Sequence, residues 1–208
     1  YPQLYGPRQL LPREWPIVRR VLDKRPFLIV PDGGLTVKSQ GWVENAAHAT
    51  LLATERPNAA VGKIYNVADS YSLSVRQIAE IIAEELNHSW EIISLPHEVA
   101  TSTRPLLTSW SSSHRVLDIG PTVRDLGYKD LVDPIEAWRL AARWLADNPL
   151  EPGGELEKRL QDPFEYETED RQYQIWRECR ERLLSAEWTT PPGFSSAYVG
   201  RVPNPADS

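Results

Sequence analysis

The apolar and polar positions alternate between short runs and helical stripes over the first part of the chain. Residues 27–30 form an apolar run that Pro31, Asp32 and two glycines follow, which predicts a strand and then a turn. From residue 43 to residue 55, apolar side chains recur at helical spacing and predict a helix. The run over residues 63–68 predicts a buried strand.

A second helix and a second strand follow the same alternation. Ser74, with Gln77 three residues later, forms a capping box that opens a helix over residues 74–87. Residues 90–95 are prone to β structure, and residues 97–113 are rich in Ser, Thr and Pro without any period. We expect the latter stretch to be a long ordered loop over a surface or a site.

A third helix has the clearest start in the sequence. Asp133 precedes Pro134, an N-cap followed by the residue favoured at the first helical position, and the pattern predicts a helix over residues 134–147. Trp138 and Leu145 lie on its apolar face. Strands that alternate with helices predict an α/β fold, although the strands are too few for a complete doubly wound sheet.

The sequence changes character after residue 150. Residues 151–187 carry most of the excess negative charge behind the net charge of −6. A helix is predicted over residues 168–185, and the Pro-rich end over residues 189–208 is expected to be extended or disordered. The predicted parts are therefore a folded part over residues 1–150 and an acidic helix with a Pro-rich tail over residues 151–208.

Composition excludes several classes of function. The chain has 208 residues, of which 41% are hydrophobic, enough for one domain with a core, and its acidic balance argues against nucleic acid as a partner. No apolar run approaches the roughly 20 residues of a membrane span, so no membrane partner is expected. The single cysteine allows no internal disulfide, and without a secretion signal a cytoplasmic location is expected. The histidines lie singly, without metal-ligand spacing, so no metal site is expected.

Four motifs stand in a fixed order along the chain. They are Tyr-Pro-Gln-Leu-Tyr-Gly-Pro-Arg-Gln at residues 1–9, Gly-Trp-Val-Glu-Asn-Ala-Ala-His-Ala at 41–49, Tyr-Asn-Val-Ala-Asp at 65–69, and Val-Leu-Asp at 116–118 with Leu-Gly-Tyr at 126–128. Together they resemble the C-terminal, substrate-binding half of the extended short-chain dehydrogenase/reductase family, the NAD-dependent epimerase/dehydratases. The resemblance covers residues 1–147 and implies a Rossmann-type α/β fold and activity as an oxidoreductase or isomerase.

The N-terminal, dinucleotide-binding half of that family has no counterpart in this sequence. In the family, about 150 residues carry a Gly-rich phosphate loop and a catalytic Tyr-x-x-x-Lys pair. Neither motif occurs here, and a chain that opens at Tyr1 and contains no Met is expected to be part of something longer. Hydride chemistry needs a cofactor held by its pyrophosphate and an acid/base with a tuned pKa. We therefore expect no catalytic residue in this chain, NAD or NADP in the full-length parent, and neither bound by this chain alone.

The resemblance assigns site residues at the start of the chain. Tyr1 and Pro2 would run beside the nicotinamide, mainly through backbone groups. Gln3 stands where nucleotide-sugar members carry an Asn that contacts the diphosphate, just after the last-but-one strand of the sheet. An ordinary polar residue at a strand end is the other interpretation of Gln3.

Two more positions correspond to phosphate contacts in nucleotide-sugar relatives. Lys38 stands where they carry Arg, and His114 stands where they carry a second Arg, with Arg115 next door as a substitute. Arg grips a phosphate with a bidentate fork, whereas Lys is a point charge on a flexible stem. Solvated surface positions are the alternative for Lys38 and His114. Because these two positions and Gln3 depart together, the substrate either lacks a nucleoside diphosphate or is held differently.

Two side chains of the 97–113 loop complete the candidate substrate site. Trp110 could stack on a sugar or an aromatic substrate, and Arg104 could anchor an anion. Core or surface roles are the alternatives for both.

Two classes of function remain open. In the first, the chain is the substrate-binding part of an NAD(P)-dependent epimerase, dehydratase or reductase that acts on a sugar, a nucleotide sugar or another small hydroxylated or carbonyl compound. Its expected partners are then the substrate, the missing N-terminal half and a second copy in a homodimer. In the second, the chain is a non-catalytic binding or assembly module that docks on a partner through Tyr173 and Trp176 of the acidic helix. A Gly-rich βαβ unit upstream of Tyr1 would favour the enzyme.

Overall fold

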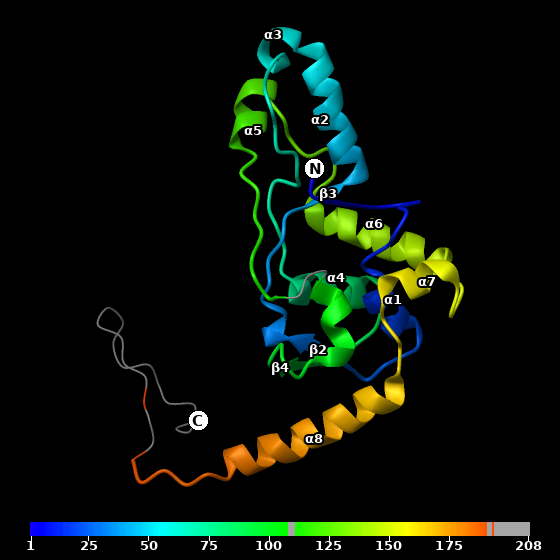
Figure 1. Ribbon diagram of the computed structural model, residues 1–208, viewed down its shortest axis with the longest axis vertical. Coiled ribbons are helices and arrows are strands. Elements are labelled where there is room, and N and C mark those ends of the chain that lie inside the picture. Colours follow the sequence, from blue (N-terminus) through cyan, green and yellow to red (C-terminus); the bar gives the residue numbers. More distant parts are fainter. Residues whose placement is uncertain (108–110, 191–192, 194–208) are drawn as a thin grey trace. The chain divides into compact units, whose positions relative to one another are not determined.

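The computed structural model describes residues 1–107, 111–190 and 193 (Figure 1). The chain divides into two compact units, residues 1–169 and residues 170–208. In the first unit, helices pack around pairs of parallel strands, which confirms the predicted α/β fold class.

Two parallel strand pairs form the β structure of the described residues. Strand β2 (Phe27–Pro31), buried along its whole length, pairs with β4 (Glu91–Leu95); both strands lie where the apolar runs predict them, and their pairing is shown by the structure. The other pair joins β1 (Gln3–Tyr5) and β3 (Gln40–Trp42). These two strands have three residues each, too few for the sequence pattern to show an alternation.

The main core lies where three helices meet β2. These are α1 (Trp15–Leu22), α4 (Val75–Glu85) and α6 (Pro134–Asp147), and they contact one another. The apolar faces predicted for the second and third of them are confirmed. Side chains of this core that are at most 3% exposed include Trp15, Val18, Leu28, Ile82, Trp138 and Leu145.

Local capping starts these helices as the sequence predicts. The Ser74 hydroxyl accepts a hydrogen bond from the Gln77 backbone N–H at 3.2 Å, while the Gln77 side chain accepts one from the Ser74 N–H at 2.9 Å. The Asp133 carboxylate accepts from the Ile135 N–H at 2.9 Å at the start of α6. Both caps satisfy backbone donors that a helix N-terminus leaves unpaired.

A smaller core lies at one end of the first unit (Figure 1). It is built on α2 (Val43–Glu55), which ends where the sequence predicts, together with the short helices α3 (Pro57–Ala60) and α5 (Gly120–Leu126). Its buried side chains are Ala46, Ala49, Leu52, Val67, Leu126 and Tyr128.

A buried polar group joins the two cores. Asp69 accepts hydrogen bonds from the Tyr5 hydroxyl at 2.9 Å, the Trp42 backbone N–H at 2.8 Å and the Asn45 amide at 3.1 Å. The Asn45 side chain also bonds the backbone of residues 131 and 132. Three of the motifs behind the family resemblance meet here, and their polar members are structural in this chain.

The strand predicted over residues 63–68 is wrong. These residues form no regular secondary structure, and Ile64, taken as a buried strand residue, is 96% exposed. Single contacts hold the segment instead: the Asp69 N–H donates to Gln40 O at 2.9 Å, and the Tyr65 hydroxyl donates to Asp125 at 3.0 Å. The apolar letters resembled a strand, but the described residues provide no ladder of backbone partners for it.

The loop predicted over residues 97–113 contains a short helical turn, η2 (Thr101–Leu107), with Leu107 fully buried. A second turn, η1 (Asp32–Gly34), follows β2 at the predicted position.

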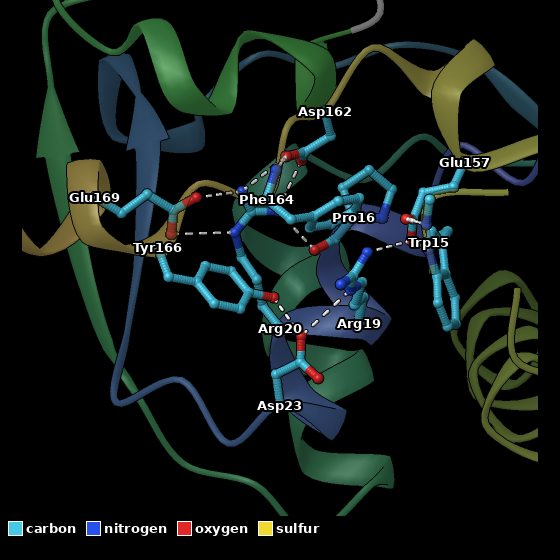
Figure 2. A network of polar contacts seen from close by, with 11 residues as sticks. Trp15, Pro16, Arg19, Arg20, Asp23, Glu157, Asp162, Phe164, Tyr166 and Glu169 are labelled. Atoms are coloured by element: carbon cyan, nitrogen blue, oxygen red, sulfur yellow. Dashed lines mark hydrogen bonds and ion pairs between the residues drawn. The ribbon is translucent and has the colours of Figure 1, made fainter. Parts of the chain in front are cut away.

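The compact first unit extends past residue 150, where the sequence predicts a change. Helix α7 (Glu155–Leu160) and the first residues of α8 (Tyr166–Leu184) belong to it. Arg20 of α1 is fully buried and donates to Asp162 at 2.8 Å and to Glu169, so its charge is neutralised from this segment (Figure 2). The Trp15 indole N–H donates to Glu157 at 2.8 Å in the same way.

The second unit, described by itself, continues α8 to Leu184, close to the predicted end of the acidic helix. Within it, the Tyr173 and Trp176 rings stack with centroids 6.0 Å apart. Across the described ranges, every helix is too short or too polar to traverse a lipid bilayer.

Candidate functional site

A pocket of about 290 Å³ opens where β1 and β3 lie side by side. One wall consists of Tyr1, Pro2 and the first residue of β1, and a second consists of Lys38, Ser39 and the first residue of β3. The third wall comes from Arg115 and Leu117.

Strand geometry explains why the polar side chains meet. Gln3 is paired with Gln40 in the parallel register of β1 and β3. Lys38 lies two residues before Gln40, so both project from the same face of the strand. Lys38 is in turn bridged in parallel to Arg115, with the Ser39 N–H donating to Arg115 O at 2.8 Å. Four side chains from three segments far apart in sequence are thus brought to one pocket.

A smaller cavity of about 40 Å³ adjoins this pocket. Gln3, Lys38 and Gln40 line both spaces, and Arg13 and Glu14 add charged groups from the residues just before α1. Helices α1, α4 and α6 supply apolar side chains to the rest of its wall, including Ile17 and Trp138.

Burial and neighbouring charge change the protonation of two groups here. Partial burial, together with the nearby cations Arg115 and Arg13, lowers the pKa of Lys38 to about 8. Burial raises the pKa of Glu14 to about 7, although the Gln9 amide donates a hydrogen bond to it. Both groups are therefore able to change charge near neutral pH.

The structure brings five of the candidate residues into one pocket: Tyr1, Pro2, Gln3, Lys38 and Arg115. Gln3 is the first residue of β1, so the prediction that it follows a strand is wrong, because the strand itself begins at this residue. The lining places Lys38 in a concave site, where it is half buried.

The other candidates are used elsewhere or are not described. The His114 Nδ1 accepts a hydrogen bond from the Val37 N–H at 3.0 Å. His114 is not among the described residues that line the two cavities. Arg104, in η2, donates to Glu98 O at 3.0 Å and likewise lies outside that lining. Trp110 lies outside the described residues.

Sequence reasoning missed Arg13, Glu14 and Gln40. The helix that begins at Trp15 was not predicted, so the charged pair before it had no assigned place. The sequence does contain a signal for Gln40, because it lies two residues after Lys38 and directly before the motif at residues 41–49. In the described part of the chain, no group of three or more His, Cys, Asp or Glu side chains is placed to hold a metal ion.

No protein-family model matches the chain. Among curated proteins, the chain is 25% identical to the uncharacterized protein YbjS of Escherichia coli (strain K12), over 70% of this chain and 48% of that protein. It is 33% identical to UDP-D-apiose/UDP-D-xylose synthase 2 of Arabidopsis thaliana, over 40% of this chain and 22% of that protein.

Solved structures resemble the chain over a similar span. UDP-galactose 4-epimerase matches with a TM-score of 0.54 and 22% identity, over 72% of this chain and 45% of that chain. UDP-glucuronic acid 4-epimerase from Bacillus cereus, in complex with UDP-glucuronic acid and NAD, matches with a TM-score of 0.55 and 16% identity, over 71% and 44%. This chain spans less than half the length of these proteins.

Proposed function

We propose that this chain, which has the α/β fold of the extended short-chain dehydrogenase/reductases as its resemblance implied, is the substrate-binding part of an NAD- or NADP-dependent sugar-nucleotide epimerase, dehydratase or reductase. The names of the Arabidopsis thaliana synthase and of the two similar epimerase structures support this proposal, because each name refers to a UDP-sugar. The observation that carries it lies in this chain: Arg13, Lys38 and Arg115 stand around two adjoining cavities at one end of the β1–β3 pair.

The crowding of these cations supports an anionic ligand. The charges of Arg115 and Arg13 disfavour the protonated form of Lys38, in addition to its partial burial. A phosphate group bound between them would favour that protonated form and return the pKa of Lys38 toward its ordinary value. The amides of Gln3 and Gln40 lie in the same wall and can donate to phosphate or sugar oxygens.

The residues of this chain do not by themselves fit a dinucleotide. The sequence has no Gly-rich loop that opens a helix and no Tyr-x-x-x-Lys pair, so hydride transfer would depend on groups outside it. In the proposed parent, Tyr1 and Pro2 lie at the edge of the larger pocket, where a nicotinamide would approach the substrate. The chain alone is proposed to be inactive. A cytoplasmic location and a homodimer also stay predictions.

A small anion without a nucleoside is the second candidate ligand. His114 is engaged by the Val37 backbone and Arg104 by a carbonyl group, so two of the predicted anion contacts are directed elsewhere. The pocket then holds Lys38 and Arg115 as its cations, which suits a sugar phosphate as well as a diphosphate.

Calorimetry on the 208-residue chain at low salt tests the proposal with UDP, UDP-glucose, glucose 1-phosphate and NAD. We expect at least one of the phosphorylated sugars or UDP to bind, and NAD to show no saturation at micromolar concentration. Lys38→Met should weaken that binding about ten- to a hundredfold, because a charge-assisted hydrogen bond contributes about 1.5–3 kcal/mol. Lys129→Met, at an exposed lysine outside both linings, is the matched control.

If Lys38→Met and Lys129→Met bind the ligand with equal affinity, the assigned site is wrong. If none of the phosphorylated compounds binds, the proposed function fails for this chain. Clear saturation by NAD would overturn the proposal that this part of the protein lacks a dinucleotide site.

A further inference from the structure

The smaller cavity holds two buried polar atoms that have no hydrogen-bond partner. They are Nε2 of Gln3 and Oε2 of Glu14, and both residues line this cavity. The Glu14 residue is only 2% exposed, and its other carboxylate oxygen is occupied by the Gln9 amide. Unpaired buried polar atoms are rare in folded proteins because each one costs free energy, so this pair indicates a missing partner.

The pair differs in chemistry in a way that defines its partner. Gln3 Nε2 is a donor, whereas Glu14 Oε2 is an acceptor when the carboxyl group is ionised. A hydroxyl group is both an acceptor and a donor, so one hydroxyl can satisfy both atoms. The cavity volume of about 40 Å³ admits one or a few groups of the size of water but no sugar or base ring.

We propose that the smaller cavity is a hydroxyl subsite, in which a ligand hydroxyl accepts a hydrogen bond from the Gln3 amide and donates a hydrogen bond to the Glu14 carboxylate. The inference rests on the proposed function, because Gln3, Lys38 and Gln40 line both cavities. A ligand whose phosphate occupies the larger pocket can extend a hydroxyl into the smaller one. Glu14 is thereby a specificity-determining residue that favours polyhydroxylated ligands over deoxygenated ones.

The subsite has a signature that a merely structural Glu14 would not produce. A hydroxyl that donates to the carboxylate favours its ionised form, so binding lowers the Glu14 pKa from its raised starting value and releases a proton near neutral pH. Arg13 from the segment before α1 and Lys38 from the segment before β3 are the charged groups that share the cavity lining. The measurement must therefore follow the Glu14 carboxyl carbon itself rather than total proton uptake.

The experiment records the carboxyl carbon of glutamate by NMR in the 208-residue chain against pH. Glu14→Gln, which keeps the shape of the side chain, identifies the Glu14 signal, and Glu44→Gln at an exposed position of α2 is the control. The probes are methyl α-D-glucopyranoside at high millimolar concentration, UDP, and UDP-glucose. We expect a probe that fills the subsite to lower the Glu14 pKa, and Glu14→Gln to weaken its binding about tenfold, since a neutral acceptor replaces a charged one.

The probes distinguish the source of the hydroxyl and separate the two proposals. If the Glu14 pKa falls with the glucoside and with UDP-glucose but not with UDP, the ligand group is a sugar hydroxyl. If the Glu14 pKa falls with UDP as well, the ligand group is a ribose hydroxyl. Either result supports the subsite. If UDP binds and no probe moves the Glu14 pKa, the cavity holds water only, and the subsite is overturned while the proposed function stands. If the glucoside moves it and UDP does not bind, the subsite stands and nucleotide binding fails. No binding by any probe overturns the subsite, and it overturns the proposed function as well when glucose 1-phosphate also fails to bind.

Discussion

Glu14 is a carboxyl group that the fold removes almost completely from water, so its charge depends on pH in a range where other carboxylates stay ionised. Its folded pKa of about 7 lies above the ordinary value of 4.5. As pH rises from 4.5 to 7, the unfolded chain releases this proton before the folded chain does. The stability that the protonated form contributes is therefore present below pH 4.5 and is lost as pH rises through 7.

Glu14→Gln should remove this dependence, because the amide is neutral at every pH. At pH 8 we expect the variant to be more stable than the unchanged protein by about 3 kcal/mol at most, since one pKa unit corresponds to about 1.4 kcal/mol. Below about pH 5 the difference should disappear. Urea unfolding of both proteins across this range measures it, and a difference that stays constant with pH would show that Glu14 has an ordinary pKa.

Particular side chains show how far sequence reasoning reached at this scale. Gln3, Lys38 and Arg115 were assigned by resemblance, and the parallel register then brought them to one pocket. Glu14 could not be found in this way, because its burial depends on three helices that come from distant parts of the chain.

At the scale of elements, the sequence predicts a helix start well where a side chain hydrogen-bonds directly to the backbone groups of the first turn. Ser74→Ala removes one of the two hydrogen bonds of the capping box, the one that the Ser74 hydroxyl accepts from the Gln77 backbone N–H, and leaves the one that the Gln77 side chain accepts from the backbone N–H of residue 74. We expect a loss of about 1 kcal/mol, the usual contribution of an N-cap side chain. Ser70→Ala, at an exposed serine four residues earlier, is the control and should cost close to nothing. Equal unfolding midpoints for the two variants in urea would contradict the cap's role.

Elements that depend on contacts with distant parts of the chain could not be predicted from the pattern of apolar and polar residues. The predicted strand over residues 63–68 lacked a ladder to join, whereas the three-residue strands β1 and β3 exist because they pair with each other. Helix α1 was not predicted although it is strongly amphipathic, because Pro16 and the five arginines and lysines between residues 13 and 25 interrupt the apolar residues along the sequence. Strands and short helices here are determined by tertiary contacts more than by their own residues.

At the scale of the whole molecule, the first unit includes a segment whose sequence suggested a separate part. Arg20 is held by Asp162 and Glu169, and Leu160 packs into the main core. Composition placed a boundary near residue 150 because the acidic residues begin there. Their charge is partly the counterpart of arginines in α1, and a count of charges along the sequence cannot show that pairing.

A chain that ends at residue 150 should therefore be far less stable than one that ends at residue 185. The shorter chain loses both carboxylates that pair with Arg20, together with Phe164 and Tyr166, whose rings lie over its guanidinium. Loss of Leu160 and of the Glu157 contact to Trp15 lowers its stability further. Arg20→Met in the full chain isolates the charge contribution, because Asp162 then remains buried without its cation and Glu169 keeps Arg25, at 4.0 Å; breaking a buried ion pair from one side costs about 3–5 kcal/mol. Urea unfolding of the three proteins at pH 7 measures the differences. If the chain that ends at residue 150 unfolds at the same urea concentration as the longer one, residues 151–169 are an appendage, and the boundary suggested by composition is the physical one.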